Sequence, residues 1–272
     1  MSERAPVRGV EQGFPRPAAG AAMSDRGREV AGGEATRRGA RVVSLVPSVT
    51  ETLLAWGVVP AAVTRFCDAP GLPTVGGTKT PDVRAIVALA PDLVVMDTEE
   101  NRREDAEALR LSGVAVHVTG VRAIGDVGPT LASLARAVSA AGFPGPGEPA
   151  VRSGPAGVAT VTAWVPIWRR PWMSIGGATY GSSLLDAAGI GNVYAGSPDP
   201  YPEVTLEEAA ARDPEVVLAP SEPYPFSERH RAELEEVAPV VFVDGRDLFW
   251  WGHRTAGALA RLREVATTLR RR

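Results

Sequence analysis

Residues 41–51 decide the fold of this chain: Arg41-Val-Val-Ser-Leu-Val-Pro-Ser-Val-Thr-Glu51. The β-branched run 41–46 predicts a buried strand, and Pro47 ends it. Ser48 with Glu51 three residues later has the spacing of a capping box. We therefore expect a helix that opens at this box, runs to Trp56 and stops at Gly57.

The same strand-to-helix unit recurs along the chain, which predicts parallel sheets with right-handed crossovers. Strands are expected at 61–66, 92–96, 114–118, 158–165, 216–219 and 240–243. Helices are expected at 83–90, 102–111, 182–188, 205–212, 227–237 and 255–271. The helix at 205–212 opens on a second capping box, Thr205 with Glu208. The longest central helix is expected at 124–141, with Leu131, Leu134, Ala135 and Val138 on one stripe.

This pattern predicts an α/β fold of two Rossmann-like lobes joined by a single long backbone helix. We assign residues 1–40 to a disordered tail, because they lack apolar periodicity, and 41–121 to an N-terminal lobe. Residues 122–157 form the connecting helix and its linker, and 158–272 form a C-terminal lobe. Ligands of such folds bind at the carboxyl ends of the strands, so a cleft between the lobes is expected.

Composition excludes several classes of function. The chain has 29 basic and 32 acidic residues and a net charge of -3, which leaves no excess of positive charge for nucleic acid. Cys67 is its single cysteine, so an internal disulfide is impossible. The start carries no apolar run of the kind that opens a secretory signal, and no stretch is long enough to span a membrane. We expect a cytoplasmic monomer, or an extracytoplasmic protein if the start is misassigned.

Metal and catalytic motifs are not found. The three histidines, His117, His230 and His253, have no zinc-site spacing, and no nucleophile elbow or phosphate loop is present. We interpret His117 as structural, His230 as solvated on a charged helix face, and His253 as the histidine closest to a ligand site. Asp97, Glu99 and Glu100 follow a strand, where they could act in acid–base chemistry or be solvated. The sequence predicts no metal site, no resident cofactor and no enzyme.

Aromatic and polar side chains gather in the loops of the second lobe. Trp164, Trp168 and Trp172 follow its first strand, and Asp247-Leu-Phe-Trp-Trp251 with Arg254 follows its last. Indole and phenol faces suit a flat, bulky ligand, and Asp or Arg can fix polar groups at its rim. Adjacent Trp250 and Trp251 point opposite ways in extended chain, so at least one is expected to be available.

The segments 41–51, Ile86-Val-Ala-Leu-Ala-Pro-Asp-Leu-Val-Val95 and Pro202-Glu-Val-Thr-Leu-Glu-Glu208 resemble the cobalamin and ferric-siderophore periplasmic-binding family. The resemblance implies a substrate-binding protein of ABC-transporter type that holds a corrinoid, haem or iron chelate between its lobes. It places ligand contacts at Thr78, Asp97, Trp172, Tyr201, Asp247, Trp250, Trp251 and Arg254. It also places permease-docking carboxylates at Glu207 and, near Arg84, at Asp82.

Two alternatives stay open beside this hypothesis. The first is an exported, transporter-coupled receptor whose start is misassigned. The second is a cytosolic enzyme or chaperone of cofactor metabolism that uses Asp97, Glu99 and His253. The resemblance leaves both the identity of the ligand and the existence of a permease partner undecided.

Overall fold

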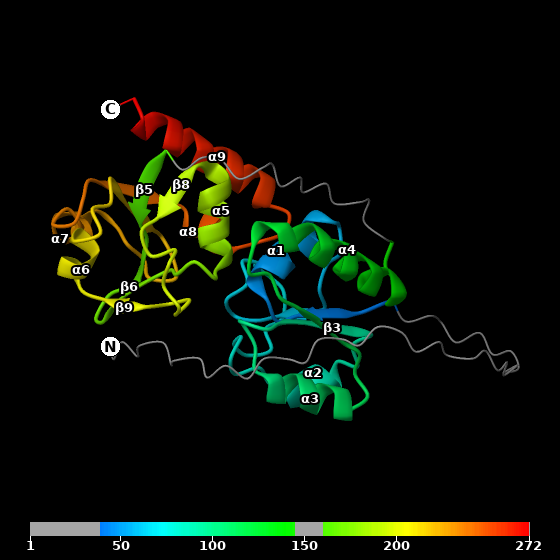
Figure 1. The fold of residues 1–272 in the computed structure, drawn as a ribbon. Coiled ribbons are helices and arrows are strands. Elements are labelled where there is room, and N and C mark those ends of the chain that lie inside the picture. The colour runs from blue at the N-terminus through cyan, green and yellow to red at the C-terminus, as the bar shows by residue number, and fades with distance from the viewer. Residues whose placement is uncertain (1–38, 145–159, 272) are drawn as a thin grey trace, which may run out of the picture.

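The computed structural model describes residues 39–144 and 160–271. It is an α/β protein with two parallel sheets, one in each of two lobes, as the strand-to-helix pattern predicts. Figure 1 shows the N-lobe with its sheet between two layers of helices, and the C-lobe beside it. The expected tail 1–40 and linker 142–157 fall almost wholly outside the described residues.

The N-lobe sheet has four parallel strands in the order β2-β1-β3-β4. Helices α1 and α4 lie on one side of it and α2 and α3 on the other (Figure 1). Its strands are nearly continuous apolar runs because both faces are covered. The elements are β1 (Val42–Ser44), α1 (Pro47–Ala55), β2 (Ala62–Val63), α2 (Val83–Ala88), β3 (Leu93–Asp97), α3 (Arg103–Leu111), β4 (Val116–Thr119) and α4 (Ile124–Ala140).

The start of α1 differs from the predicted capping box. The helix begins at Pro47, with Val46 as its N-cap and no side-chain cap. Proline suits this position because its fixed φ is already helical and its missing N–H would have had no partner. Ser48 therefore lies inside the helix, and Glu51 pairs with Arg254 of the other lobe. The predicted end is confirmed: Gly57 follows the helix at φ 75°.

Helix α4 packs against elements of both lobes. Its apolar stripe is Val127, Leu131, Leu134 and Val138, which are all buried. These residues belong to one hydrophobic cluster that also includes side chains of α1, α5 and α9. The lobes therefore share part of their core, and moving one against the other would expose apolar surface.

The C-lobe contains a parallel sheet in the order β11-β10-β5-β8 and a smaller antiparallel sheet in the order β6-β7-β9. The predicted box of Thr205 and Glu208 is confirmed at the start of α6. The elements are β5 (Val161–Trp164), β6 (Pro166–Trp168), β7 (Trp172–Ser174), α5 (Tyr180–Ala188), β8 (Ile190–Asn192), β9 (Glu203–Val204), α6 (Leu206–Ala210), β10 (Val216–Pro220), η1 (Glu228–His230), α7 (Arg231–Leu234), β11 (Val240–Val243), α8 (Gly245–Phe249) and α9 (Thr255–Leu269).

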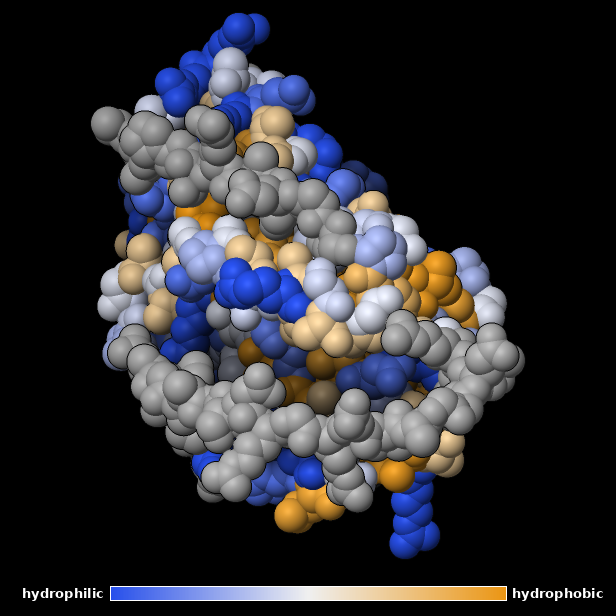
Figure 2. Space-filling view, turned by 90° about the vertical axis from the view of Figure 1, so that its right-hand side faces the viewer, coloured by the Kyte–Doolittle hydropathy of each residue, from blue (hydrophilic) through white to orange (hydrophobic). Residues whose placement is uncertain are grey.

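The surface is chemically mixed. Seen from the right-hand side of Figure 1, the described surface carries hydrophilic and apolar residues side by side (Figure 2). Within the described residues, no helix is long and apolar enough to cross a membrane.

Candidate functional site

A tight turn at the carboxyl end of β3 is organised by Asp97. Its Oδ1 accepts a hydrogen bond from the Glu99 N–H and its Oδ2 accepts one from the Thr119 hydroxyl, both at 2.8 Å. Asn101 completes the turn, since its Oδ1 accepts from the Asp97 N–H at 2.8 Å. Burial raises the pKa of Asp97 to about 6, although these hydrogen bonds oppose the rise. Asp97 is 3% exposed, so it holds the turn while its neighbours face solvent.

That turn presents two carboxylates, Glu99 and Glu100, both exposed. The Lys79 ammonium donates to the Glu99 carbonyl oxygen, and Arg122 Nε lies 4.0 Å from Glu99 Oε1. Partial desolvation raises the pKa of Glu100 to about 7, and the negative charge of Asp97 adds to this rise. The N-lobe therefore offers an acidic edge.

Two contacts join this edge to the C-lobe. The Tyr201 hydroxyl donates to Glu99 Oε2 at 3.2 Å, and Arg246 Nη1 donates to Asp68 Oδ2 at 2.9 Å. Tyr201 precedes β9, Arg246 lies in α8, and Asp68 follows β2. Because each contact joins a residue between the strands of one lobe to a residue between the strands of the other, the two contacts mark the interlobe site that the fold predicts.

The C-lobe side of this site carries Glu222 and Trp250. Burial raises the pKa of Glu222, and a hydrogen bond from Trp250 opposes the rise. The Arg246 guanidinium lies 5.0 Å from the centre of the Trp250 ring, which is half-buried. The charge of Glu222 also contributes, as a minor cause, to the raised pKa of Glu100.

Phe66 is an aromatic side chain that the sequence analysis did not single out. It follows β2, stands two residues before Asp68, and is 55% exposed. The Arg65 guanidinium lies 4.8 Å from the centre of its ring. Its position in the sequence could have identified it, because ligands bind at the carboxyl ends of the parallel strands and Phe66 lies just beyond one of these ends.

The structure buries Trp251, Asp247 and Thr78 of the predicted ligand residues and leaves Trp172 and Arg254 half-buried. Trp251 is 6% exposed and lies in the hydrophobic core, while Trp172 packs 5.7 Å from Trp164 and stacks on Phe226 at 5.9 Å. Asp247 is buried between Arg254 and Arg261, and Thr78 is buried with its carbonyl accepting from Asn101. Of the predicted set, Tyr201 and Trp250 lie at the interlobe site. Ligand contacts remain a prediction for the whole set.

The prediction for His230 is wrong. It is buried, with its ring 5.4 Å from Tyr224 and 5.6 Å from Phe226. The expected helix 227–237 starts instead as the 3-10 turn η1, which turns His230 inward, and burial lowers its pKa. The described part of the chain contains no group of three or more His, Cys, Asp or Glu side chains that could hold a metal ion.

The two predicted docking carboxylates lie on different lobes and are both exposed. Glu207 stands in the first turn of α6. Asp82 caps α2 by accepting from the Ala85 N–H at 3.0 Å, which engages one of its oxygens. Docking remains a prediction for both.

Comparison with known proteins gives consistent relatives, although no family model matches the chain. The vitamin B12-binding protein of Salmonella choleraesuis is 28% identical over 189 residues, which cover 65% of this chain and 71% of the relative. The vitamin B12-binding protein of Vibrio cholerae is 22% identical over 250 residues, covering 85% and 89%.

Solved structures share the fold. The periplasmic vitamin B12-binding protein BtuF of Vibrio cholerae matches with a TM-score of 0.68 at 18% identity, over 85% of this chain and 98% of that one. The periplasmic haem-binding protein BhuT, in complex with two haems, matches with a TM-score of 0.66 at 20% identity, over 84% and 98%.

The two-lobed fold is the one that periplasmic binding proteins have. The relatives and neighbours support the family that the sequence resembles, the cobalamin, haem and ferric-siderophore periplasmic-binding proteins. All of these are binding proteins, which supports the expectation of a non-enzyme. The expectation of a cytoplasmic protein is contradicted, because the structural neighbours are periplasmic.

Proposed function

We propose that this chain is an extracytoplasmic binding protein of an ABC-type importer and that it holds a corrinoid in its interlobe site. The observation that carries the choice of ligand is the charge of the site. Glu99 and Glu100 from one lobe and Glu222 from the other are carboxylates, and the charge of Glu222 contributes to the raised pKa of Glu100. The vitamin B12-binding relatives support the same class of ligand.

The carboxylates of Glu100 and Glu222 should discriminate between metal chelates by the charge and the hydrogen-bond donors of the ligand. The rim of a corrin carries amide side chains, whose N–H groups can donate to Glu100 and Glu222. Haem carries propionates and ferric catecholates carry net negative charge, so both would meet like charges at Glu100 and Glu222. The nearby cations Arg122 and Arg246 already pair with Glu99 and Asp68. The site therefore favours a neutral, donor-rich chelate.

The state of Tyr201 also favours a corrinoid over a ferric ligand. A phenol coordinates ferric iron as phenolate, whereas burial and the neighbouring Glu99 raise the pKa of Tyr201 above its ordinary value. Its proton is also engaged in the hydrogen bond to Glu99. Tyr201 is thus suited to contact a ligand through its ring, together with Phe66 and Trp250.

Titration of the purified protein with cyanocobalamin, haemin and a ferric catecholate siderophore tests this proposal. Quenching of tryptophan fluorescence should give the tightest binding for cyanocobalamin. The double variant Glu100→Gln, Glu222→Gln should narrow the preference over haemin by about tenfold, since neither amide can carry the negative charge of the carboxylate that it replaces. Glu264→Gln, at an exposed position in α9, is the matched control. Tighter binding of haemin to the unmodified protein would refute the choice of ligand.

We further propose that Glu207 docks a membrane permease. Its carboxylate is exposed in α6 on the C-lobe and pairs with no cation in the described residues. Glu207→Lys should abolish uptake of labelled cobalamin by cells that depend on this protein, while leaving the affinity of the purified protein unchanged. Glu264→Lys is the control for added positive charge. Normal uptake with Glu207→Lys would exclude this docking contact.

A further inference from the structure

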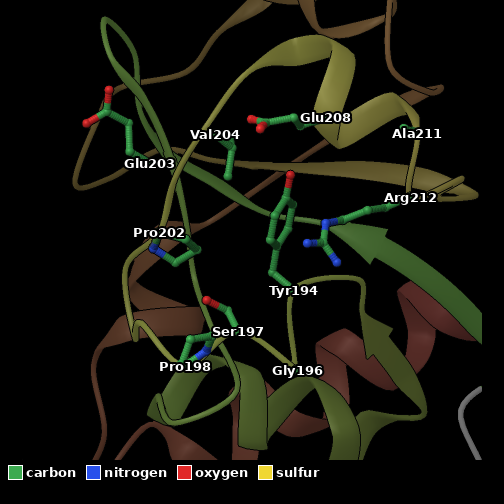
Figure 3. A pocket seen from close by; sticks show the side chains of 10 residues that line it. All are labelled: Tyr194, Gly196, Ser197, Pro198, Pro202, Glu203, Val204, Glu208, Ala211 and Arg212. Atoms are coloured by element: carbon green, nitrogen blue, oxygen red, sulfur yellow. The ribbon is translucent and has the colours of Figure 1, made fainter.

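A pocket lies on the C-lobe, between the loop that follows β8 and helix α6 (Figure 3). Its volume is about 520 Å³, which is within the range of small-molecule sites. None of the residues of the interlobe contacts, Asp68, Glu99, Tyr201 and Arg246, lines this pocket. It is therefore separate from the site proposed for the corrinoid.

Tyr194 brings an unsatisfied polar atom to this pocket. Its backbone N–H donates to Asn192 Oδ1 at 3.0 Å, which fixes the residue just beyond β8. The side chain is 3% exposed, and its hydroxyl has no hydrogen-bond partner. A buried hydroxyl without a partner destabilises the fold, so a ligand that forms a hydrogen bond with it would recover free energy. Burial raises the pKa of Tyr194, the adjacent Arg212 opposes the rise and the charge of Glu208 adds to it, so the hydroxyl keeps its proton and can donate.

Arg212 supplies a positive charge beside that hydroxyl. Its guanidinium lies 4.1 Å from the centre of the Tyr194 ring, and its Nη1 donates to the Val193 carbonyl oxygen at 3.2 Å. These contacts hold the guanidinium plane while its other N–H groups remain available. Within residues 39–144 and 160–271, no carboxylate forms an ion pair with it.

The two carboxylates that line the pocket do not compensate Arg212. Glu208 Oε2 accepts from the Thr205 N–H at 2.7 Å in the capping box of α6. The carboxylate of Glu203 points away from Arg212 (Figure 3). The pocket therefore combines an arginine that forms no ion pair within the described residues with one buried hydroxyl donor, next to the apolar side chains Pro198, Pro202 and Val204 and with two carboxylates at its edge.

We propose that this pocket binds a small organic anion, whose carboxylate or phosphate is held by Arg212 and the Tyr194 hydroxyl and whose apolar part lies against the two prolines and Val204. Arginine recognises both groups because its N–H fork matches their oxygens. The inference does not depend on the ligand of the interlobe site.

Benzoate, phenyl phosphate and the uncharged isostere benzamide are suitable probes, measured by saturation-transfer NMR on the full chain. Benzoate should saturate with a dissociation constant on the order of 1 mM, as expected for so small a ligand. Benzamide should bind about tenfold more weakly. A stronger signal for phenyl phosphate than for benzoate would identify phosphate as the preferred group. Equal binding of benzoate and benzamide, or no saturable binding by either anion, would overturn the proposal.

Single substitutions test the contributions of Arg212 and of the Tyr194 hydroxyl separately. Arg212→Gln should weaken benzoate about tenfold and Tyr194→Phe several-fold, whereas Arg110→Gln, at an exposed position in α3, should have no effect. Glu208→Gln keeps the capping box and removes a negative charge, so it should tighten benzoate binding. Unchanged benzoate affinity in Arg212→Gln would refute the site. Saturating cyanocobalamin should not displace benzoate, which distinguishes this pocket from the interlobe site.

Discussion

Arg254 of the C-lobe donates from Nε to Oε2 of Glu51 on α1 of the N-lobe at 2.9 Å. The same guanidinium donates from Nη1 to Asp247 at 2.8 Å, and Arg261 Nε donates to the other oxygen of Asp247 at 2.6 Å. The four side chains form one charged network in which Asp247 is buried. This network fixes the lobes to one another on the side of α1 and α9.

Arg254→Met tests this network. The substitution keeps the apolar stem and leaves Glu51 without its cation and Asp247 with Arg261 alone. Because the site is partly buried, we expect the free energy of unfolding to fall by about 2–3 kcal/mol, measured by urea denaturation. Arg103→Met breaks the exposed pair with Glu107 and should cost no more than about 0.5 kcal/mol. Equal costs in the two variants would show that the interlobe network adds no special stability.

The sequence predicted more of the fold than of the candidate site. Long apolar runs and helical periodicity located α4 and the parallel strands other than β8, because burial on both faces leaves a strong pattern. The parallel strand β8 was missed, because it is only three residues long. The antiparallel sheet of β6, β7 and β9 was missed, because its strands are two or three residues long and the aromatic run 164–172 was interpreted as a loop.

The site depends on contacts that no local pattern contains. Tyr201 and Glu99 are 102 residues apart, and Arg246 and Asp68 are 178 apart. Which of the neighbours Trp250 and Trp251 faces solvent is decided by the shared core, and alternation showed only that one of them should.

Gly252 is a second contact between the lobes. Its φ is +123°, and a Cβ added there would lie 2.2 Å from Thr52 Oγ1. Thr52 Oγ1 also accepts from the His253 N–H at 3.1 Å, so the collision falls where the lobes approach. Gly252→Ala should therefore lower the free energy of unfolding by at least about 2 kcal/mol.

Gly125→Ala is the control for Gly252→Ala. Gly125 lies in α4 with nothing within 4 Å of an added Cβ, so alanine should stabilise the chain by about 0.5–1 kcal/mol. Thermal unfolding of the two variants should shift in opposite directions. A shift of the same sign in both would mean that the approach at Thr52 is not restrictive.

Asp97 should make stability depend on pH. Its pKa rises from 3.8 to about 6 on folding, so the folded chain binds the proton more tightly than the unfolded chain. The contribution of Asp97 is therefore favourable below its unfolded pKa and is lost as the pH rises from about 4 to about 7, by about 2–3 kcal/mol.

Asp97→Asn isolates that contribution. Asparagine is uncharged throughout and its oxygen can still accept from the Glu99 N–H, so the fall in stability between about pH 4 and 7 should become shallower than in the unmodified protein. Asp186→Asn, at an exposed position in α5, should leave the profile unchanged. Parallel profiles for Asp97→Asn and the unmodified protein would show that Asp97 does not bind a proton in this range.

Tyr201→Phe removes the hydrogen bond to Glu99 and keeps the ring. On the proposed function, a ligand entering the site separates this pair, so the variant should associate with cyanocobalamin up to about fivefold faster in stopped-flow fluorescence. Tyr201→Leu also removes the aromatic face and should bind more weakly at equilibrium. A slower association with Tyr201→Phe would mean that the hydroxyl contacts the ligand.

Substitutions of the adjacent Trp250 and Trp251 should have different effects, one on ligand binding and the other on stability. Trp251 lies in the shared core, so Trp251→Ala should lower the free energy of unfolding by about 3–5 kcal/mol, measured by urea denaturation. Trp250 lies at the interlobe site beside Arg246, so Trp250→Ala should cost little stability and weaken cyanocobalamin binding by more than about 1 kcal/mol. Calorimetric titration of the folded variants distinguishes the two effects. If Trp250→Ala bound cyanocobalamin with unchanged affinity, the C-lobe face of the ligand site would have to be sought among the other predicted aromatics, Trp172 and Tyr201.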